Sequence, residues 1–339
     1  MFPQAEMKKN NSFIQINNVS KSNSGNTAID AITCRLDLNN RIGIIGETGS
    51  GKSTLLKVIA GLCQPDEGEI YFNNHRVLGP EEKLIPGHPK IAYLSQHFEL
   101  RNNYQIWDIL SFENQMTEAD ANELYKLCKI SHLLNRWTDE LSGGEKQRIA
   151  LAKLLITQPE LLLLDEPFSN LDNQNKAIVH EVINDLMNEY KISCIMVSHD
   201  ITDVLSWCDE LLVIQNGSII QQDETKKVYH FPVNIYTAGL LGDFQLFPFN
   251  SSIYQQIKPQ TSIPDKSLFV RPHFFTSSNK NISSNIITGF VKSIHKKGFY
   301  YLIDISVETE ILKIVTLNNE IQEGDTLHLK YNQNQHWFI

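Results

Sequence analysis

The sequence predicts an α/β protein with a mostly parallel sheet covered by helices on both faces, followed by a small all-β domain. Between residues 41 and 221, short apolar runs typical of strands alternate with helical stretches, which is the pattern of a parallel sheet. From residue 266 onward, strand-like runs follow one another with few helical signals. We therefore expect a first domain at residues 12–240, a linker at 241–265, and a β barrel of the oligonucleotide/oligosaccharide-binding shape at 266–339.

The composition is that of a soluble globular protein, with 339 residues, 41% of them hydrophobic and 20% charged. The net charge of −9 lacks the basic excess of nucleic-acid-binding proteins, so no nucleic-acid partner is expected. The five cysteines are odd in number and form no C-x-x-C pair, which favours free thiols in a reducing cytosol. Since no run of 18 apolar residues exists and residues 1–11 lack a signal peptide's apolar core, we expect any membrane role to come through a partner.

The first strand-like runs predict an antiparallel β subdomain. Residues 13–19 and 28–38 alternate apolar and polar side chains, and residues 22–26 (SNSGN) between them are predicted to form a turn. Residues 68–72 and 75–78 are predicted to form a second hairpin.

The stretch around which the chain is organised lies between these two pairs. Residues 46–54 (GETGSGKST), named here the phosphate loop, fit the pattern G-x-x-x-x-G-K-[ST] between a strand-like run at 41–45 and a helical run at 55–61. Glycines let backbone N–H groups surround phosphate oxygens, and the helix N-terminus adds partial positive charge. The candidate nucleotide-binding residues are Gly46, Glu47, Thr48, Gly49, Ser50, Gly51, Lys52, Ser53 and Thr54.

Two side chains of the loop and two acids further along have candidate chemical roles. Lys52 can reach the β- and γ-phosphates, and the Ser53 hydroxyl can ligate Mg²⁺. Residues 161–164 are four leucines, typical of a buried parallel strand, and Asp165 and Glu166 follow at its carboxyl end. Asp165 can hold Mg²⁺ opposite Ser53, and Glu166 can polarise an attacking water. Taken alone, this acid pair is equally consistent with a solvated strand end.

The remaining elements complete the two domains. A helical subdomain is expected at about residues 100–157, after a short strand at 90–95 with Gln96 at its end. Later predicted elements of the first domain are a helix at 176–190, a strand at 192–197 and a hairpin formed by 210–215 and 218–221. The strands predicted in the second domain are residues 268–271, 286–295, 299–307, 311–317 and 326–331.

A second candidate anion site begins the helix expected at 141–156. Residues 141–145 (LSGGE), named here the signature, place Ser142, Gly143 and Gly144 where backbone N–H groups and the helix dipole can face an anion. In isolation, Ser-Gly-Gly is also an ordinary flexible helix cap. With the phosphate loop in the same chain, the signature gives two phosphate-binding helix starts, too far apart in sequence to form one site.

Together these segments resemble an ATP-binding cassette protein, whose core is a P-loop NTPase of the RecA-like type. The resemblance covers about residues 12–240 and includes, in order, the phosphate loop, Gln96, the signature, the leucine strand with Asp165 and Glu166, residues 169–172 (SNLD), and His199 after a strand. It implies Glu166 as the water-polarising base, His199 as the switch at the γ-phosphate, and Gln96 as the link between Mg²⁺ and a moving subdomain. It also implies that Asp172 contacts a second cassette, and that ATP and Mg²⁺ are the ligands.

Beyond the cassette, the chain is similar to solute-importer ATPases of the maltose, polyamine, sulfate, molybdate and ferric iron type. Residues 228–243 resemble their exit helix, and residues 270–272 (VRP) with the following strands resemble their C-terminal TOBE/OB-like regulatory domain. Three features depart from that pattern. The turn at 21–27 lacks the adenine-stacking aromatic residue, His273 stands where an acid is common, and the β domain is shorter than that of the maltose type.

The resemblance predicts an ATP-hydrolysing subunit of a membrane importer that works as a head-to-tail dimer of cassettes. Its expected partners are a second cassette subunit, transmembrane permease subunits and, through them, a solute-binding protein, which would place it on the cytoplasmic face of the membrane. Residues 96–107 are the predicted docking segment for the permease, with Phe98 and Tyr104 as the contacts. Three alternatives remain open: a soluble cassette ATPase of DNA repair or translation, a non-catalytic nucleotide-binding scaffold, and an export ATPase.

Overall fold

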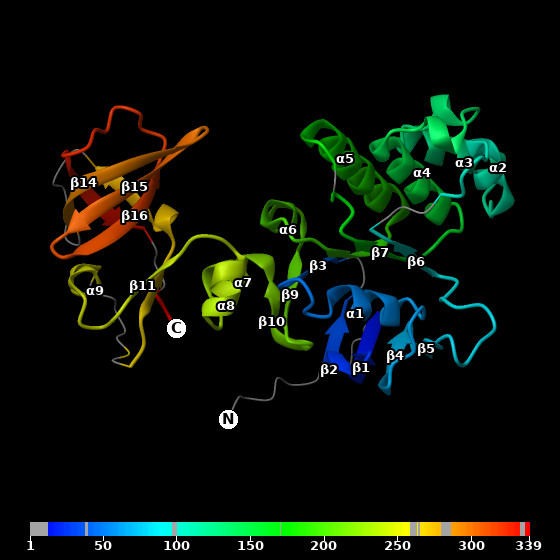
Figure 1. Cartoon of the computed structure of the whole chain (residues 1–339), viewed down its shortest axis with the longest axis horizontal. Helices are drawn as coiled ribbons and strands as arrows, with labels where there is room; N and C mark the ends of the chain where they lie inside the picture. The colour runs from blue at the N-terminus through cyan, green and yellow to red at the C-terminus, as the bar shows by residue number, and fades with distance from the viewer. Residues whose placement is uncertain are drawn as a thin grey trace. The chain divides into compact units, whose positions relative to one another are not determined.

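The computed structural model describes residues 13–37, 40–96, 100–169, 171–257, 263, 265–278, 286–332 and 336–339. The chain divides into two compact units, residues 1–225 and 226–339 (Figure 1). This division falls ahead of the domain end expected at residue 240. The reason is that α8 (Ile235–Leu240) contributes Ala238 to the hydrophobic core of the second unit.

A six-stranded sheet with the order β10-β9-β3-β8-β7-β6 forms the centre of the first unit. All neighbouring strands are parallel except β10, which pairs antiparallel with β9. Every residue of β7 and β8 is buried, as a sheet covered on both faces requires. The strands are β3 (Arg41–Ile45), β6 (Ile91–Leu94), β7 (Leu161–Asp165), β8 (Ser193–Val197), β9 (Glu210–Gln215) and β10 (Ser218–Glu224).

Helices cover both faces of this sheet. Helix α1 (Lys52–Ile59) lies on one side, and α4 (Gly143–Leu155), α5 (Asn173–Tyr190) and α6 (Ile201–Trp207) lie on the other (Figure 1). Leu161 and Leu163 of β7 belong to the core that contains α1. Because side chains alternate along a strand, Leu162 and Leu164 face the helices on the opposite side. The parallel α/β core predicted from the sequence is confirmed.

An antiparallel sheet with the order β2-β1-β4-β5 packs beneath α1 and shares its core. The first hairpin turns at Ser24 and Gly25 alone, whose φ angles of 50° and 83° suit a two-residue loop, so its turn is shorter than expected. The strands are β1 (Ile14–Asn23), β2 (Asn26–Leu36), β4 (Glu67–Phe72) and β5 (His75–Arg76).

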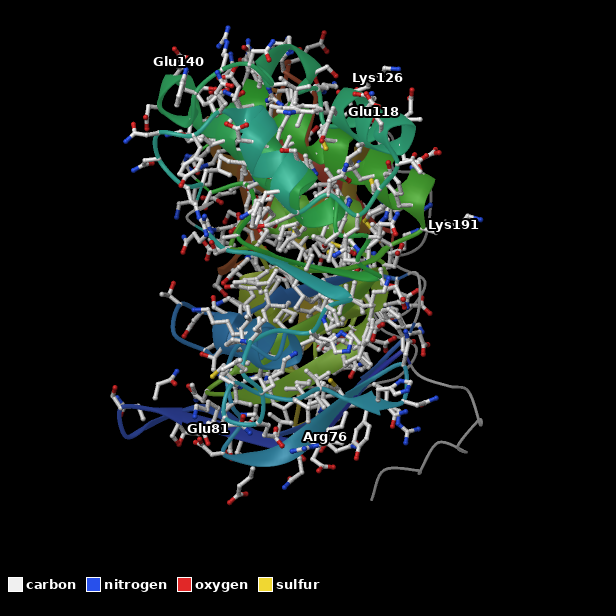
Figure 2. All side chains as sticks on the ribbon, turned by 90° about the vertical axis from the view of Figure 1, so that its right-hand side faces the viewer. Arg76, Glu81, Glu118, Lys126, Glu140 and Lys191 are labelled. Carbon is white, nitrogen blue, oxygen red and sulfur yellow. The ribbon has the colours of Figure 1, made fainter. Side chains whose placement is uncertain are left out.

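A helical subdomain lies at the opposite end of the first unit from this antiparallel sheet. Figure 2 shows Glu118, Lys126 and Glu140 at the helical end and Arg76 and Glu81 at the other. Helix α4 is joined there by α2 (Ile106–Phe112), α3 (Glu118–Leu127) and two 3₁₀ turns (Ser131–Leu133 and Thr138–Glu140). The helical subdomain expected at about residues 100–157 is therefore built from separate helices, because the Thr117 hydroxyl accepts the N–H of Asp120 and begins α3 anew.

The second unit contains a curled five-stranded sheet with the order β13-β17-β14-β15-β16. Its outer strands β13 and β16 lie close together without forming a ladder among the described residues, so the predicted barrel is a half-barrel. The strands are β13 (Phe275–Ser278), β14 (Ile286–Lys297), β15 (Tyr300–Val307), β16 (Glu310–Thr316) and β17 (Thr326–Tyr331).

The stretch predicted as a linker, residues 241–265, differs from that prediction where it is described. It contains β11 (Gln245–Phe247), which joins β12 (Leu268–Val270) and β18 (Trp337–Phe338) in a small sheet, and helix α9 (Ser252–Ile257). The glutamines, serines and prolines suggested a linker, but the apolar residues between them are buried in the core of the second unit. These buried residues are Phe247, Ile253, Tyr254 and Ile257.

A fully buried arginine ties the start of the second unit to its sheet. Arg271, which directly follows β12, donates from Nη2 to the Ala238 carbonyl at 3.3 Å and from Nη1 to the Gly242 carbonyl at 3.1 Å. Its Nε donates to the carbonyl of Tyr229, in helix α7 (Thr225–His230), at 3.1 Å, and the guanidinium lies 4.0 Å from the Tyr229 ring centroid. Burial lowers the pKa of Arg271 to about 10.

Candidate nucleotide-binding site

The phosphate loop joins the end of β3 to the start of α1, as the sequence predicts. Gly51, just ahead of the helix, has a φ angle of 103°, and a Cβ atom there would lie 2.0 Å from the Ala28 carbonyl oxygen. A Cβ atom on Gly46 would lie 2.2 Å from the Ile214 carbonyl oxygen. Only glycine fits both positions, so the glycines allow the loop to pass between neighbouring strands.

Lys52 is held inside the loop by the loop's own backbone. Its ammonium group donates to the carbonyl oxygens of Gly46 at 2.8 Å and Glu47 at 2.7 Å. Burial lowers the pKa of Lys52, while the nearby carboxylates of Glu166 and Asp165 act in the opposite direction. The cation is thus positioned beside the loop, where a phosphate can replace the carbonyl oxygens as its partner.

A cavity of about 630 Å³ opens over the phosphate loop and brings together residues from five separate parts of the sequence. Its volume is in the range of small-molecule sites. Three predicted site residues from outside the loop, Gln96, Glu166 and His199, line it together with six loop residues. The full lining is Asn23, Ala28, Thr48, Gly49, Gly51, Lys52, Ser53, Thr54, Gln96, Glu166 and His199.

Glu166 is held at this cavity by two of the other predicted residues. The Gln96 side-chain amide donates to Oε2 of Glu166 at 2.9 Å, and Nδ1 of His199 lies 3.3 Å from the same oxygen. Glu166 has a φ angle of 50°, a left-handed conformation that is costly for a residue with a side chain. Such strain is concentrated at functional sites, where the surrounding structure holds the residue in place.

Asp165, at the end of β7, faces the first turn of α1. Its Oδ1 atom accepts a hydrogen bond of 2.9 Å from the Ser53 hydroxyl, and the side chain is buried, with an exposed fraction of 5%. A hydroxyl beside a carboxylate is a donor set of hard oxygens, which suits Mg²⁺. Among the described residues, no group of three or more His, Cys, Asp or Glu side chains could hold a metal ion. The two side chains therefore fit a Mg²⁺ ion that takes its other ligands from phosphates and water.

The loop around His199 is fixed by an ion-pair network. Lys176 of α5 contacts Asp200 at 2.5 Å and the buried Asp203 of α6 at 2.7 Å. Asp203 also accepts from the Ser198 hydroxyl at 3.3 Å. The pKa of Asp200 falls to about 2, because its hydrogen bonds from Lys176 and Thr202 outweigh the opposing effect of burial. These residues hold the backbone on both sides of His199.

The signature begins α4 on the far side of the sheet from α1 (Figure 1). Ser142 and Glu145 form a reciprocal capping box, in which the Glu145 carboxylate accepts the Ser142 N–H at 2.8 Å. Gly143 faces open space, whereas Gly144 packs against the Asn175 side chain, which donates to Asp172 at 2.6 Å. Ser142, Gly143, Gly144 and Asp172 do not line the cavity over the phosphate loop.

Three residues near the site were not predicted from the sequence to be site residues. Asn23 and Ala28, on neighbouring strands of the antiparallel sheet, line the cavity, and the Asn23 amide donates to the Thr54 hydroxyl at 3.4 Å. Tyr93 of β6 donates to Asp165 Oδ2 at 2.8 Å. No local pattern marks these residues, because strand pairing alone brings them to the loop.

The fold and the cavity define a P-loop protein that binds a nucleoside triphosphate. A sequence profile of the family described as "ABC transporter" matches residues 29–169. The chain is 30% identical over 328 residues to the sulfate/thiosulfate import ATP-binding protein CysA of Synechocystis, with 94% of this chain and 90% of that protein covered. It is also 34% identical over 241 residues to the glucose import ATP-binding protein GlcV of Saccharolobus solfataricus, with 68% of each chain covered.

Solved structures to which the chain is similar are also ATP-binding cassettes. The chain is similar to CbiO1 of Clostridium perfringens, described as part of the ABC transporter complex CbiONQ, with a TM-score of 0.57 and 26% identity over 65% of this chain and 91% of that one. It shares its fold with a dimeric ATP-binding cassette in a post-hydrolysis state with ADP and phosphate, at a TM-score of 0.54 and 24% identity over 62% of this chain and 98% of that one.

This chain belongs to the family of ABC transporter ATP-binding subunits, of the type that hydrolyses ATP to drive solute import. The resemblance to importer ATPases, the predicted fold class and the predicted ATPase function are thereby confirmed. No helix in the described part of the chain is long and apolar enough to cross a membrane.

Proposed function

We propose that two cassettes of this chain meet head to tail and enclose ATP between the phosphate loop of one copy and the signature of the other. The observation that supports this proposal is the position of the two helix starts. Helices α1 and α4 lie on opposite sides of one sheet, and the signature is absent from the cavity over the loop. A single copy thus carries the phosphate loop of one composite site and the signature of another.

The site residues predicted from the sequence have proposed roles in hydrolysis. Lys52 and the backbone N–H groups of the phosphate loop bind the β- and γ-phosphates. A Mg²⁺ ion held by Ser53 and Asp165 would neutralise charge on the phosphates, with Gln96 contacting it as the resemblance implies. Glu166 accepts a proton from the attacking water, and His199, already 3.3 Å from that carboxylate, contacts the γ-phosphate. Asp172 contacts the partner copy beside the composite site.

A groove in the helical subdomain is suited to binding a partner such as the permease. A cavity of about 300 Å³ in the helical subdomain includes Tyr104 and Ile109 among its walls, with charged side chains around them. Phe112 has an exposed fraction of 88%, and Tyr104 and Trp107 each have one of 45%. Exposed aromatic residues beside arginine are enriched at binding hot spots. The full lining is Arg101, Tyr104, Asp108, Ile109, Phe112, Glu113 and Lys153.

We propose that a cytoplasmic helix of the permease docks in this groove, which would hold the cassette at the cytoplasmic face of the membrane. Phe98, the other predicted contact, lies outside the described residues. The relatives reported above are named for the import of sulfate or thiosulfate and of glucose. Such different solutes indicate that the cassette supplies energy, while the permease and its solute-binding protein would select the solute.

The dimer arrangement can be tested through Gly143. An added side chain there meets nothing within 4 Å, so Gly143→Asp should fold normally. In a Glu166→Gln background that retains ATP, the aspartate should abolish ATP-dependent dimers by repelling the phosphates of the partner copy. ATP binding by the monomer should stay unchanged, and Gly143→Ala should still dimerise. A loss of monomer ATP affinity, or normal dimers of Gly143→Asp, would contradict the proposal.

A further inference from the structure

The carboxylate of Asp165 receives one hydroxyl on each of its two oxygens. The Ser53 hydroxyl donates to Oδ1 at 2.9 Å, and the phenol of Tyr93 donates to Oδ2 at 2.8 Å. Ser53 belongs to the phosphate loop, but Tyr93 belongs to no segment with an assigned role. Its position at the site calls for an explanation beyond core packing.

Strand pairing fixes where Tyr93 lies. Strand β6 is parallel to β7, and Tyr93 is paired with Leu163, two residues ahead of Asp165. Because side chains alternate along a strand, Leu163 and Asp165 lie on the same face, toward α1. The Tyr93 ring packs against the core that contains Leu163, and its hydroxyl reaches Asp165. The ring is thus anchored in the core, and the polar end is directed at the acid.

The chemistry of this contact suits a permanent hydrogen-bond donor. An ionised carboxylate has only acceptor atoms, so the phenol O–H of Tyr93 is the donor in this hydrogen bond. With Oδ2 engaged in this way, the carboxylate cannot rotate freely, and Oδ1 stays directed toward Ser53.

We propose that Tyr93 is a positioning residue for the metal ligand Asp165, holding the carboxylate so that Oδ1 and the Ser53 hydroxyl face one Mg²⁺ ion. This inference rests on the metal site assigned above under the proposed function. Hydrogen bonds to ligating carboxylates orient them, and losing such an outer contact typically lowers metal affinity by about 10- to 100-fold. Tyr93 thus connects strand β6, whose end leads to Gln96, with the metal ligand on β7.

Tyr93→Phe removes only the hydroxyl and tests the inference directly. In a Glu166→Gln background that retains ATP, Mn²⁺ binding is measured by electron paramagnetic resonance. We expect an affinity about 10- to 100-fold weaker than in the parent. ATP binding measured with EDTA present should be unchanged. In an otherwise unaltered chain, Tyr93→Phe should raise the Mg²⁺ concentration for half-maximal ATPase activity, and excess Mg²⁺ should restore most of kcat.

The chain offers a matched control in Tyr71 of β4. Its hydroxyl also donates to a carboxylate, that of Glu69, at 2.8 Å, but away from the cavity. Tyr71→Phe should leave Mn²⁺ affinity unchanged, and circular dichroism should show the native fold for both variants. If Tyr93→Phe binds Mn²⁺ as tightly as Tyr71→Phe does, Tyr93 has no positioning role and the inference is wrong.

Asp165→Asn separates this inference from the proposed function. If Asp165→Asn loses Mn²⁺ while Tyr93→Phe keeps it, the metal site stands and the role of Tyr93 fails. If Asp165→Asn binds Mn²⁺ normally, the metal is held elsewhere, and both the proposed site and the inference are overturned. Weakened binding in both variants, with the larger loss in Asp165→Asn, is the expected result.

Discussion

The side-chain amide of Gln96 donates a hydrogen bond of 2.9 Å to Oε2 of Glu166. His199 lies 3.3 Å from the same oxygen, so this atom is shared by groups that follow two different strands, β6 and β8. A movement of either segment would change the position or the basicity of the carboxylate. Glu166 is therefore placed where closure of the proposed dimer can control it.

Glu166→Gln should keep ATP binding and lower turnover by about 10²- to 10⁴-fold, because the amide keeps the shape of the side chain and cannot accept the proton. ATP-loaded dimers should accumulate and be visible by size-exclusion chromatography. Glu160→Gln, at an exposed position just ahead of β7, is the control and should turn over normally. Near-normal hydrolysis by Glu166→Gln would show that Glu166 is not the base.

The cavity wall near Asn23 predicts weak selectivity for the base. Asn23 lines the cavity where the family's aromatic residue is missing, so we expect ATP and GTP to be hydrolysed with similar efficiency. Asn23→Tyr should strengthen ATP binding by about 1–3 kcal/mol through stacking on adenine. Ser24→Tyr, on a residue that does not line the cavity, should have little effect. Strong preference for ATP in the unaltered chain, with no gain from Asn23→Tyr, would show that another group already binds the base.

Substitutions in the groove of the helical subdomain should impair permease binding without impairing ATP hydrolysis. Replacing Tyr104 and Phe112 by alanine removes two exposed aromatic contacts and should weaken capture of the permease subunits in a pull-down from membranes. Basal ATPase activity of the purified protein should remain. Phe299→Ala, at an aromatic residue of the second unit with an exposed fraction of 84%, is the control. Normal assembly of the double variant would reject the groove as the docking site.

The buried Arg271 predicts a large effect on stability. Arg271→Met would remove a donor from the carbonyl oxygens of Tyr229, Ala238 and Gly242, and a buried acceptor that is left unpaired costs about 1–3 kcal/mol. We expect the second unit to lose on the order of 3 kcal/mol or more, measured by thermal unfolding. ATP binding by the first unit should persist. Lys313→Met, at an exposed position of β16, should change little, and an equal loss there would contradict the role of Arg271.

The parts of the site that the sequence predicts well are those in which local backbone and chemistry coincide. The phosphate loop, the leucine strand with Asp165 and Glu166, and the strand end at His199 each combine an element boundary with the residues that act there. The parallel order of the strands then places these boundaries at one edge of the sheet. For this reason Gln96, Glu166 and His199 meet in the cavity although 103 positions separate the first from the last (199 − 96).

The parts that were missed depend on contacts between distant segments. In the sequence, nothing distinguishes Tyr93 from an ordinary strand residue. Only the pairing of β6 with β7 brings its hydroxyl to Asp165. The stretch at 241–265 has the composition of a linker. Its few apolar side chains are nevertheless buried in a core whose other residues lie mostly further along the sequence. Composition averages over a segment, whereas burial is decided residue by residue.

The carbonyl groups around Arg271 also bear on how such proteins can exchange parts during evolution. A fusion made after residue 240 would carry Arg271 away from the carbonyls of Tyr229 and Ala238 with which it is paired. A fusion made after Thr225 would keep the arginine and all its partners in one inherited piece. A C-terminal domain acquired or lost by recombination should therefore bring residues 226–243 with it, so the ancestry of this short helical segment should follow that of the half-barrel.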